Sequence, residues 1–263
     1  MKRQDFFSVI YEDENIVAVN KSSGIAVTPD RWDLSVERLD TLAAKSLNIK
    51  KLYTVHRIDK DTSGLVIFAK NSETHKALSA AFEERLVKKR YIAAVHGRPL
   101  WEETSCDLAL VPNGNKQHLT IIDKYRGKKS LTHFRVLGSA GNFSILEAIP
   151  ETGRTHQIRV HLASLGHPVI CDELYGNLKP VMLSAIKRGW RGDPLNEHPL
   201  ICRLGLHAAE LFIPGYGAAA EAQGSPCEGG LGLKAPLPRD MAALIKQMEK
   251  AAGREFGALS VTT

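Results

Sequence analysis

Cysteine, aromatic residues and long apolar runs are all scarce in this chain of 263 residues. The 4 cysteines (Cys106, Cys171, Cys202 and Cys227) lie far apart and form no CxxC pair. This spacing excludes a disulfide framework or a zinc ribbon and is typical of reduced thiols in the cytosol. No stretch reaches the roughly 18 uninterrupted apolar residues of a membrane span. The basic start MKRQDFF leads on to acidic YEDEN, so no signal peptide is expected. We therefore predict a cytoplasmic protein without membrane association.

The excess of positive over negative charge is also small. Lys and Arg number 35 and Asp and Glu number 29, which leaves a formal net charge of +6. Hydrophobic residues make up 43% and charged residues 24%, a composition that excludes wholesale disorder. The isoelectric point near 9.1 is a weak indication of a polyanionic partner such as nucleic acid.

The hydrophobic pattern predicts strands and helices in mixed order. Helices are expected over residues 72–86, with Ser72 as N-cap, over 155–165, and from 239 to Gly253. The Gly- and Ala-rich stretch 214–232 is interpreted as a loop. Because the elements do not alternate as βαβ units, the predicted class is α+β. Strands are expected at residues 6–11, 16–20, 52–55, 65–69, 91–95 and 144–149.

The loop of residues 56–64, HRIDKDTSG, carries an unusual density of ionisable groups between two predicted strands. One interpretation is a solvated turn, in which Gly64 supplies a permissive backbone. Another is a carboxylate in a basic setting, where Asp59 would act as nucleophile or base. Asp59 and Asp61 could also be a paired acid and base, but no second carboxylate motif supports a glycosidase-type pair. A hydrolase using His56, Asp59 and Asp61 would need a metal or a further motif, and the sequence offers neither.

This loop resembles the signature of the RluA family of pseudouridine synthases, which act on ribosomal and transfer RNA. The family pattern is HR-(Leu/Ile)-D-x-x-T-S-G, and its aspartate is the catalytic residue, which matches Asp59. Further motifs follow in the family's order, so the resemblance covers most of the chain. One departure is the early K-P-x-G turn, which here reads Lys21-Ser22-Ser23-Gly24 and bears on turn rigidity more than on chemistry. The other matching segments are KRYIAAVHG, GRTHQIRVHLASLGHPVICDELYG, LGLHAAELFIP and APLPRDM.

The resemblance implies a pseudouridine synthase catalytic fold: a mixed, mainly antiparallel central sheet flanked by helices, with an RNA-binding cleft. It implies a single catalytic domain over residues 1–263. The sequence leaves no room before Phe6 for a separate N-terminal RNA-binding domain, and because no exposed helix pattern demands a partner, we expect a monomer. The reaction breaks the N1–C1′ bond of a uridine, turns the uracil and rejoins it through C5. That chemistry needs no cofactor, and the sequence has neither GxGxxG nor GxxxxGK[ST].

The resemblance also assigns residues to the site. Beside Asp59, Arg159 matches the arginine that pairs with the catalytic aspartate, which keeps a carboxylate ionised. Tyr91 matches the tyrosine that stacks on the flipped uracil. Without the resemblance, Arg159 would be interpreted as a helix-surface residue and Tyr91 as an ordinary core tyrosine. Further substrate-binding residues are Arg57, which would enter the RNA stack, with His56, Thr62, Val169 and Ile170, the last two as apolar pocket walls.

Basic residues near an aromatic side chain are candidates for RNA contact. The segment KRGWRG contributes Lys187, Arg188, Trp190 and Arg191, and Lys89 lies in a second basic run. Because +6 is modest for a protein that grips RNA, we expect the positive groups around the Asp59 loop and acids such as Glu12, Asp13 and Glu14 elsewhere. No metal site is expected, because His156 and His161 are five residues apart and would point in different directions on a helix.

These observations favour an RNA pseudouridine synthase that flips specific uridines of rRNA, tRNA or both into a pocket, with Asp59 as the catalytic carboxylate. The alternative is a non-catalytic RNA-binding or ribosome-assembly factor on the same fold. Such a factor would keep the basic surface but would not need Asp59, Tyr91 and Arg159 together. Attack on the sugar, attack on the base and a glycal route all stay open, as does the identity of the target RNA.

Overall fold

The computed structural model describes residues 6–28, 37–113, 119–216 and 229–256. The chain forms two compact units, one from residues 1–90 and 208–236 and the other from 91–207 and 237–263. The chain passes from one unit to the other within β5 (Lys88–His96) and again within β11 (Leu206–Pro214). The single catalytic domain stays a prediction.

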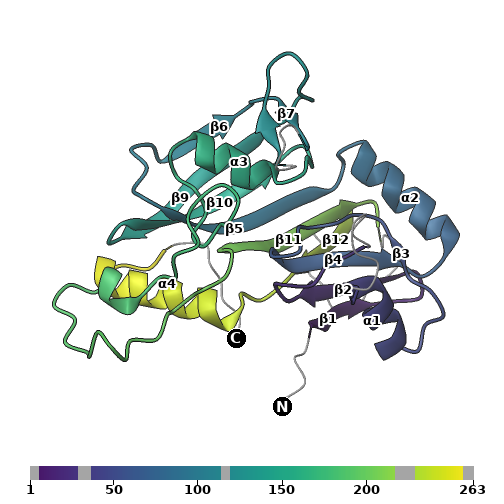
Figure 1. The fold of residues 1–263 in the computed structure, drawn as a ribbon. Coiled ribbons are helices and arrows are strands. Elements are labelled where there is room, and N and C mark those ends of the chain that lie inside the picture. The colour runs from purple at the N-terminus through teal and green to yellow at the C-terminus, as the bar shows by residue number, and fades with distance from the viewer. Residues whose placement is uncertain (1–5, 29–36, 114–118, 217–228, 257–263) are drawn as a thin grey trace. The chain divides into compact units, whose positions relative to one another are not determined.

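The first unit is built on the strands of a sheet. Its strands run in the order β1 (Phe7–Glu12), β2 (Ile16–Lys21), β4 (Ser63–Ala69) and β11, with β3 (Tyr53–Thr54) paired to β4 and β12 (Gly230–Lys234) paired to β11 (Figure 1). The pairs β1–β2, β2–β4, β3–β4 and β11–β12 are antiparallel. Every residue of β4 is buried, and so are the first four residues of β2. Burial on both faces explains why these strands are nearly continuous apolar runs.

Two helices belong to the first unit, α1 (Leu39–Ser46) and α2 (Ser72–Glu83). The expected N-cap of α2 is wrong: Asn71 occupies that position, and its side-chain oxygen accepts a 2.8 Å hydrogen bond from the amide of Thr74. Leu78 is buried as expected, whereas Leu86 lies beyond the helix and is 50% exposed. The apolar stripe therefore ends one turn earlier than its sequence pattern indicated.

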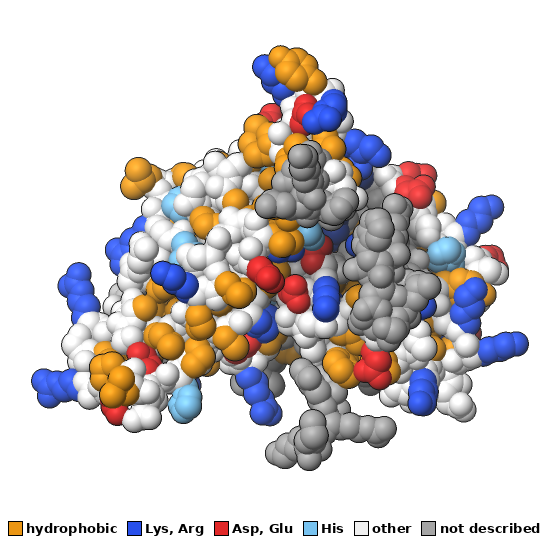
Figure 2. Space-filling model, in the orientation of Figure 1, with side chains coloured by type: hydrophobic (Ala, Val, Ile, Leu, Met, Phe, Trp, Pro, Cys, Tyr) orange, Lys and Arg blue, Asp and Glu red, His pale blue; other side chains and the backbone are white. Residues whose placement is uncertain are grey.

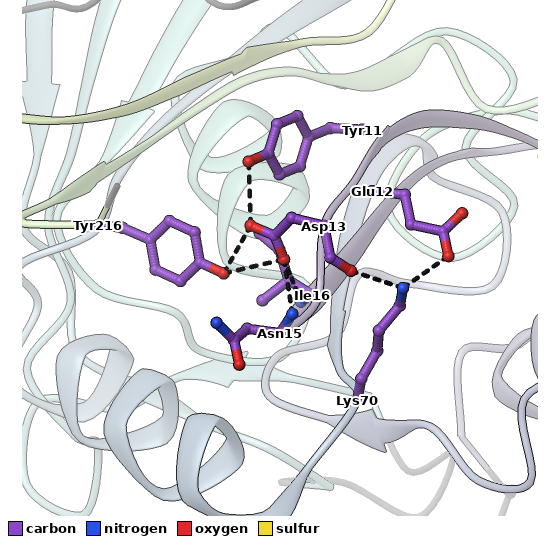
Figure 3. A network of polar contacts seen from close by, with 7 residues as sticks. All are labelled: Tyr11, Glu12, Asp13, Asn15, Ile16, Lys70 and Tyr216. Carbon is purple, nitrogen blue, oxygen red and sulfur yellow. Dashed lines mark hydrogen bonds and ion pairs between the residues drawn. The ribbon is translucent and has the colours of Figure 1, made fainter. Parts of the chain in front are cut away.

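The hairpin of β1 and β2 is held by a polar network around Asp13 (Figure 3). The carboxylate of Asp13 accepts hydrogen bonds from the hydroxyls of Tyr11 and Tyr216, both at 3.0 Å, and from the turn amides. The ammonium of Lys70 donates to the carboxylate of Glu12 and to the carbonyl of Asp13. These two acids therefore stabilise a turn of the first unit.

In the second unit, antiparallel strands run in the order β5, β10 (Phe143–Pro150), β9 (Thr132–Ala140) and β6 (Glu103–Cys106). A separate hairpin joins β7 (Leu110–Val111) and β8 (Ile121–Ile122). Helices α3 (Gln157–Ser164) and α4 (Arg239–Ala252) belong to this unit (Figure 1), as does the short 3₁₀ helix η1 (Leu183–Ala185).

Alternation along β10 divides the core of this unit between two faces. On one face Ile158 and Leu162 of α3 pack in a cluster with Leu146. On the opposite face Gly138 pairs with Ile145, and the ring of Phe256 fills the space where a Cβ on Gly138 would lie. The sheet is thus covered on both sides by segments far apart in the sequence.

The predicted α+β class with a mainly antiparallel sheet is confirmed, and the three predicted helices and six predicted strands are all present within a few residues. The prediction of a loop over 214–232 is wrong at both ends, because Pro214 ends β11 and residues 230–232 begin β12. Residues 217–228 of that prediction lie outside the described part. In the described residues, no helix combines the length and hydropathy needed to cross a bilayer.

Candidate active site

The backbone of the Asp59 loop is fixed on several sides within the first unit. The ammonium of Lys21, only 1% exposed, donates to the carbonyls of Lys60 at 2.7 Å and of Ser22 and Ile25 at 2.9 Å. The carbonyl of Lys60 also accepts from the amide of Gly24 at 2.9 Å. On the other side of Asp59, its own carbonyl accepts from the amide of Thr62. The turn of residues 21–24 therefore holds the backbone of the Asp59 loop in place, although it lacks the proline of the K-P-x-G pattern.

The side chains of this loop differ sharply in exposure. Arg57 and Asp61 are exposed and Asp59 is half-buried, whereas Thr62 is 2% exposed. Among the described residues the hydroxyl of Thr62 has no hydrogen-bond partner. A buried hydroxyl without a partner is uncommon and is a natural acceptor or donor for a bound ligand or water. These features fit the substrate-binding roles predicted for Arg57 and Thr62, which stay predictions.

His56 is held as a neutral structural group. Its Nε2 accepts a 2.9 Å hydrogen bond from the amide of Ile67, and its ring stacks on Phe82 with centroids 4.5 Å apart. Burial, together with the charge of Lys89, lowers the pKa of His56 to about 3. A neutral imidazole with Nε2 already in use is poorly placed to serve as a general base. The hydrolase built on His56, Asp59 and Asp61 is therefore not favoured.

Arg159 of α3 is part of a buried ion pair in the second unit. Its Nε and Nη2 each donate a 2.8 Å hydrogen bond to the carboxylate of Asp172, and the two side chains are 5% and 0% exposed. Burial acts to raise the pKa of Asp172, but the hydrogen bonds and charge of Arg159 lower it below its usual value. Arg159 is thus not a helix-surface residue. Its predicted pairing with Asp59 stays a prediction.

Tyr175 joins this ion pair to its surroundings. The guanidinium of Arg159 lies over the Tyr175 ring, 5.2 Å from the centroid. The Tyr175 hydroxyl accepts from the amide of Thr120 at 3.0 Å and lies 2.8 Å from Nδ1 of His156. His156 itself precedes α3 with a φ of 54°, a left-handed conformation that few non-glycine residues adopt. One edge and one face of the guanidinium are therefore fixed by Asp172 and Tyr175.

The remaining predicted residues of the second unit lie close to its core. Tyr91 is half-buried on β5 and packs against the cluster that contains Ile158 and Leu162. Val169 and Ile170 are 0% exposed, and the backbone of Ile170 hydrogen bonds with Ala94 and Gly205. Both aliphatic residues support the backbone beside Asp172. Their roles as pocket walls, and that of Tyr91 in stacking, stay predictions.

Comparison with known proteins decides the family. Residues 15–164 match the RNA pseudouridylate synthase family. The chain belongs to this family. Over 248 residues it is 32% identical to ribosomal large subunit pseudouridine synthase D of Zymomonas mobilis, covering 91% of this chain and 72% of that protein. Over 213 residues it is 37% identical to the dual-specificity RNA pseudouridine synthase RluA of Vibrio cholerae, covering 80% and 78%.

The fold of the synthase has solved counterparts. The structure of human RNA pseudouridylate synthase domain containing 1 aligns with a TM-score of 0.66 at 25% identity, over 97% of this chain and 99% of that one. Human RNA pseudouridylate synthase domain containing 4 aligns with a TM-score of 0.68 at 22% identity, over 92% of each chain. The chain is thus an enzyme, an isomerase that converts uridine in RNA to pseudouridine, and the non-catalytic alternative is not supported.

Sequence reasoning missed three residues that organise the synthase. The sequence predicted Lys21 to lie in a turn. It placed Asp172 and Tyr175 inside a long matching motif without giving either a role. A lysine that ends a buried strand was the available signal for Lys21, because such a side chain must find acceptors. For Asp172 the signal was a lone carboxylate directly after the apolar run VIC.

The residues predicted to contact RNA are mostly on the surface. Lys187, Arg188 and Arg191 are exposed and Trp190 is half-buried, whereas Lys89 is half-buried beside His56. Burial, and next the charge of Arg85, lower the pKa of Lys89. Figure 2 shows basic side chains dispersed over the face that it draws, with acidic ones among them. The concentration of positive charge around the Asp59 loop stays a prediction. In the described part of the chain, no three His, Cys, Asp or Glu residues are grouped to hold a metal ion.

Proposed function

We propose that Asp59 is the catalytic carboxylate of this RNA pseudouridine synthase. The observation that carries the proposal is the bracing of its loop. The carbonyl of Lys60 is held by Lys21 and Gly24, and the carbonyl of Asp59 by Thr62. A catalytic group benefits from such rigid support because small errors of position cost large factors in rate.

The reaction is an isomerisation in which atoms and electrons balance. The N1–C1′ bond of the uridine breaks, a C5–C1′ bond forms, C5 releases its proton and N1 gains one. An ionised carboxylate suits either covalent attack or stabilisation of the charge that develops when the first bond breaks. We propose that Tyr91 and Arg159 serve the same reaction, as stacking partner and as cationic group, and that Asp172 and Tyr175 orient Arg159.

We further propose that the substrates are uridines of rRNA, tRNA or both. The support is that relatives of more than 30% identity carry names for ribosomal large subunit and dual-specificity enzymes. We also propose that the protein acts as a cytoplasmic monomer. In the described residues Cys106, Cys171 and Cys202 are free thiols, as expected of a reducing compartment.

The decisive experiment compares Asp59→Asn with Asp61→Asn. The substrate is total RNA labelled with [5-³H]uridine in cells that lack the gene, and the readout is tritium released from C5. We expect Asp59→Asn to lose all detectable release while folding and RNA affinity persist, and Asp61→Asn to stay within about threefold of the parent because that side chain is exposed. Full activity of Asp59→Asn would overturn the assignment. Sequencing of the modified positions in the same RNA identifies the target.

A further inference from the structure

An exposed aromatic side chain stands at the tip of a basic turn in the second unit. Tyr125 is 84% exposed, which is exceptional for a tyrosine. It follows β8 directly, in the segment Asp123-Lys124-Tyr125-Arg126-Gly127-Lys128-Lys129. Four of these residues are cationic and one is acidic, so the segment has a net charge of 4 − 1 = +3. The pseudouridylation chemistry assigned above makes no use of this turn.

The turn is rigid although it is exposed. The carboxylate of Asp123 accepts from the amides of Tyr125 at 2.9 Å and Arg126 at 3.0 Å, and from Nε of Arg126 at 2.7 Å. Its carbonyl accepts from the amide of Gly127 at 2.8 Å. A Cβ on Gly127 would lie 2.2 Å from that carbonyl oxygen, so only glycine fits. The backbone at Tyr125 is therefore ordered before any partner binds, which lowers the entropy lost on binding.

The turn places one cation over the ring and carries three more, of which Arg126 is paired with Asp123. The ammonium of Lys124 lies 4.8 Å from the centroid of the Tyr125 ring. Arg126, Lys128 and Lys129 are exposed in the same segment. An aromatic face flanked by positive charges suits an unpaired base with its phosphates, because the ring stacks on the base and the cations pair with the backbone.

The hairpin is also tied to the residues around Arg159. The amide of Thr120, directly before β8, donates to the hydroxyl of Tyr175, whose ring lies under the guanidinium of Arg159. On the β7 side of the hairpin, the carbonyl of Ala109 accepts from the amide of Asp123, and the carbonyl of Leu110 accepts from the amide of Lys128. Tyr125 and Arg159 thus belong to one hydrogen-bonded part of the second unit.

We propose that Tyr125 is a stacking site for an unpaired base of the RNA substrate outside the target uridine, with Lys124, Arg126 and Lys128 binding the adjoining phosphates. The ligand class is single-stranded RNA, and the site contributes to affinity and not to the chemical step. This inference rests on the proposed function, because it assumes that the same RNA is the substrate.

The test for stacking uses Tyr125→Ala and Tyr125→Phe, with Leu195→Ala as the control because Leu195 is also exposed, at 93%. Binding is measured with a fluorescein-labelled oligouridylate of about ten nucleotides, and turnover with the tritiated total RNA. We expect Tyr125→Ala to raise Kd and KM about tenfold, with kcat unchanged, because stacking is lost. Tyr125→Phe and Leu195→Ala should stay within about twofold of the parent.

The test for phosphate contact compares Lys124→Ala and Lys128→Ala with Lys179→Ala, which removes an exposed lysine elsewhere in the same unit. Lys124→Ala and Lys128→Ala should each weaken binding. Each should also reduce the slope of log Kd against log salt by roughly 0.7, the value expected when one phosphate contact to a single strand is lost. Lys179→Ala should leave the slope unchanged.

Unchanged Kd and KM for Tyr125→Ala would overturn the proposal, as would a loss of kcat alone. Loss of affinity in the lysine variants without any effect of Tyr125→Ala would show phosphate contact without stacking, which also overturns it. Failure of the Tyr125 proposal is distinguishable from failure of the proposed catalytic role of Asp59. The Tyr125 proposal is decided by Kd and KM, whereas the role of Asp59 is decided by tritium release with Asp59→Asn.

Discussion

The ammonium of Lys21 lies 2.7 Å from the carbonyl oxygen of Lys60, the residue that follows Asp59. The two residues are 39 positions apart in sequence, and the lysine is 1% exposed. A buried ammonium is stable only when its donors find acceptors, and here three backbone carbonyls accept from it. Lys21 is therefore a positioning residue for the loop that carries Asp59, the carboxylate proposed to be catalytic.

Replacing Lys21 by Met is expected to lower the free energy of unfolding by about 2–4 kcal/mol, because three carbonyls lose a charged donor while the volume stays similar. At a temperature where the variant is folded, kcat for tritium release should fall at least about tenfold, since the backbone beside Asp59 loses its support. Urea denaturation and initial rates measure the two effects.

Lys76→Met is the matched control, because Lys76 is an exposed residue of α2 in the same unit. It should change the free energy of unfolding by no more than about 0.5 kcal/mol. A Lys21→Met protein with parental stability and rate would show that the buried ammonium does not position the loop.

The ion pair of Asp172 and Arg159 leads to a prediction about pH. Asp172→Asn leaves a buried guanidinium without its anion, so we expect a loss of about 3–5 kcal/mol of stability. The folded pKa of Asp172 is lowered, so its contribution is complete above the unfolded value of about 3.9 and is lost as the pH falls below it. The parent should therefore lose stability through this acid range more steeply than Asp172→Asn does.

Urea denaturation at a series of acid pH values measures that difference. Asp193→Asn is a control on a carboxylate whose pKa is also lowered, by the amide of Leu195 and by Asn196, but which is exposed. It should cost little stability at neutral pH. Equal losses in the two variants would contradict a special role for the buried pair.

The elements that could be predicted from sequence are those in which one local pattern dominates. Helix α4 shows its buried stripe, Met241, Leu244, Ile245 and Met248, and ends at Gly253, whose φ is 67°. Helix α1 was not predicted: it has 8 residues, only Leu39 and Ala43 are buried, and its N-cap, Arg38, makes no side-chain capping bond. Strand β9 was missed because a register shift opposite Ile145 and Leu146 interrupts its alternation.

The site could be predicted only in part, for a physical reason. The motif around Asp59 is contiguous, so its residues are recognisable together. The acceptors of Lys21 come from residues 22, 25 and 60, and the partner of Arg159 is 13 positions away. Such contacts depend on how the chain returns on itself, and no local periodicity encodes them. The exposure of Tyr125 is also a tertiary property, since its sequence context is ordinary for a strand end.

The neutral His56 gives a last prediction, on stability between mildly acidic and neutral pH. Its folded pKa of about 3 lies below the unfolded value of about 6.5, so its contribution is complete above pH 6.5 and is lost as the pH falls toward 3. Within that window the free energy of unfolding should fall by about 1.4 kcal/mol per pH unit from this group alone. His56→Asn removes the titration and should flatten the profile by that amount, whereas His198→Asn, at an exposed histidine, should leave the slope parallel to the parent's. Parallel profiles for the parent and His56→Asn would mean that the imidazole is not held neutral between Ile67 and Phe82.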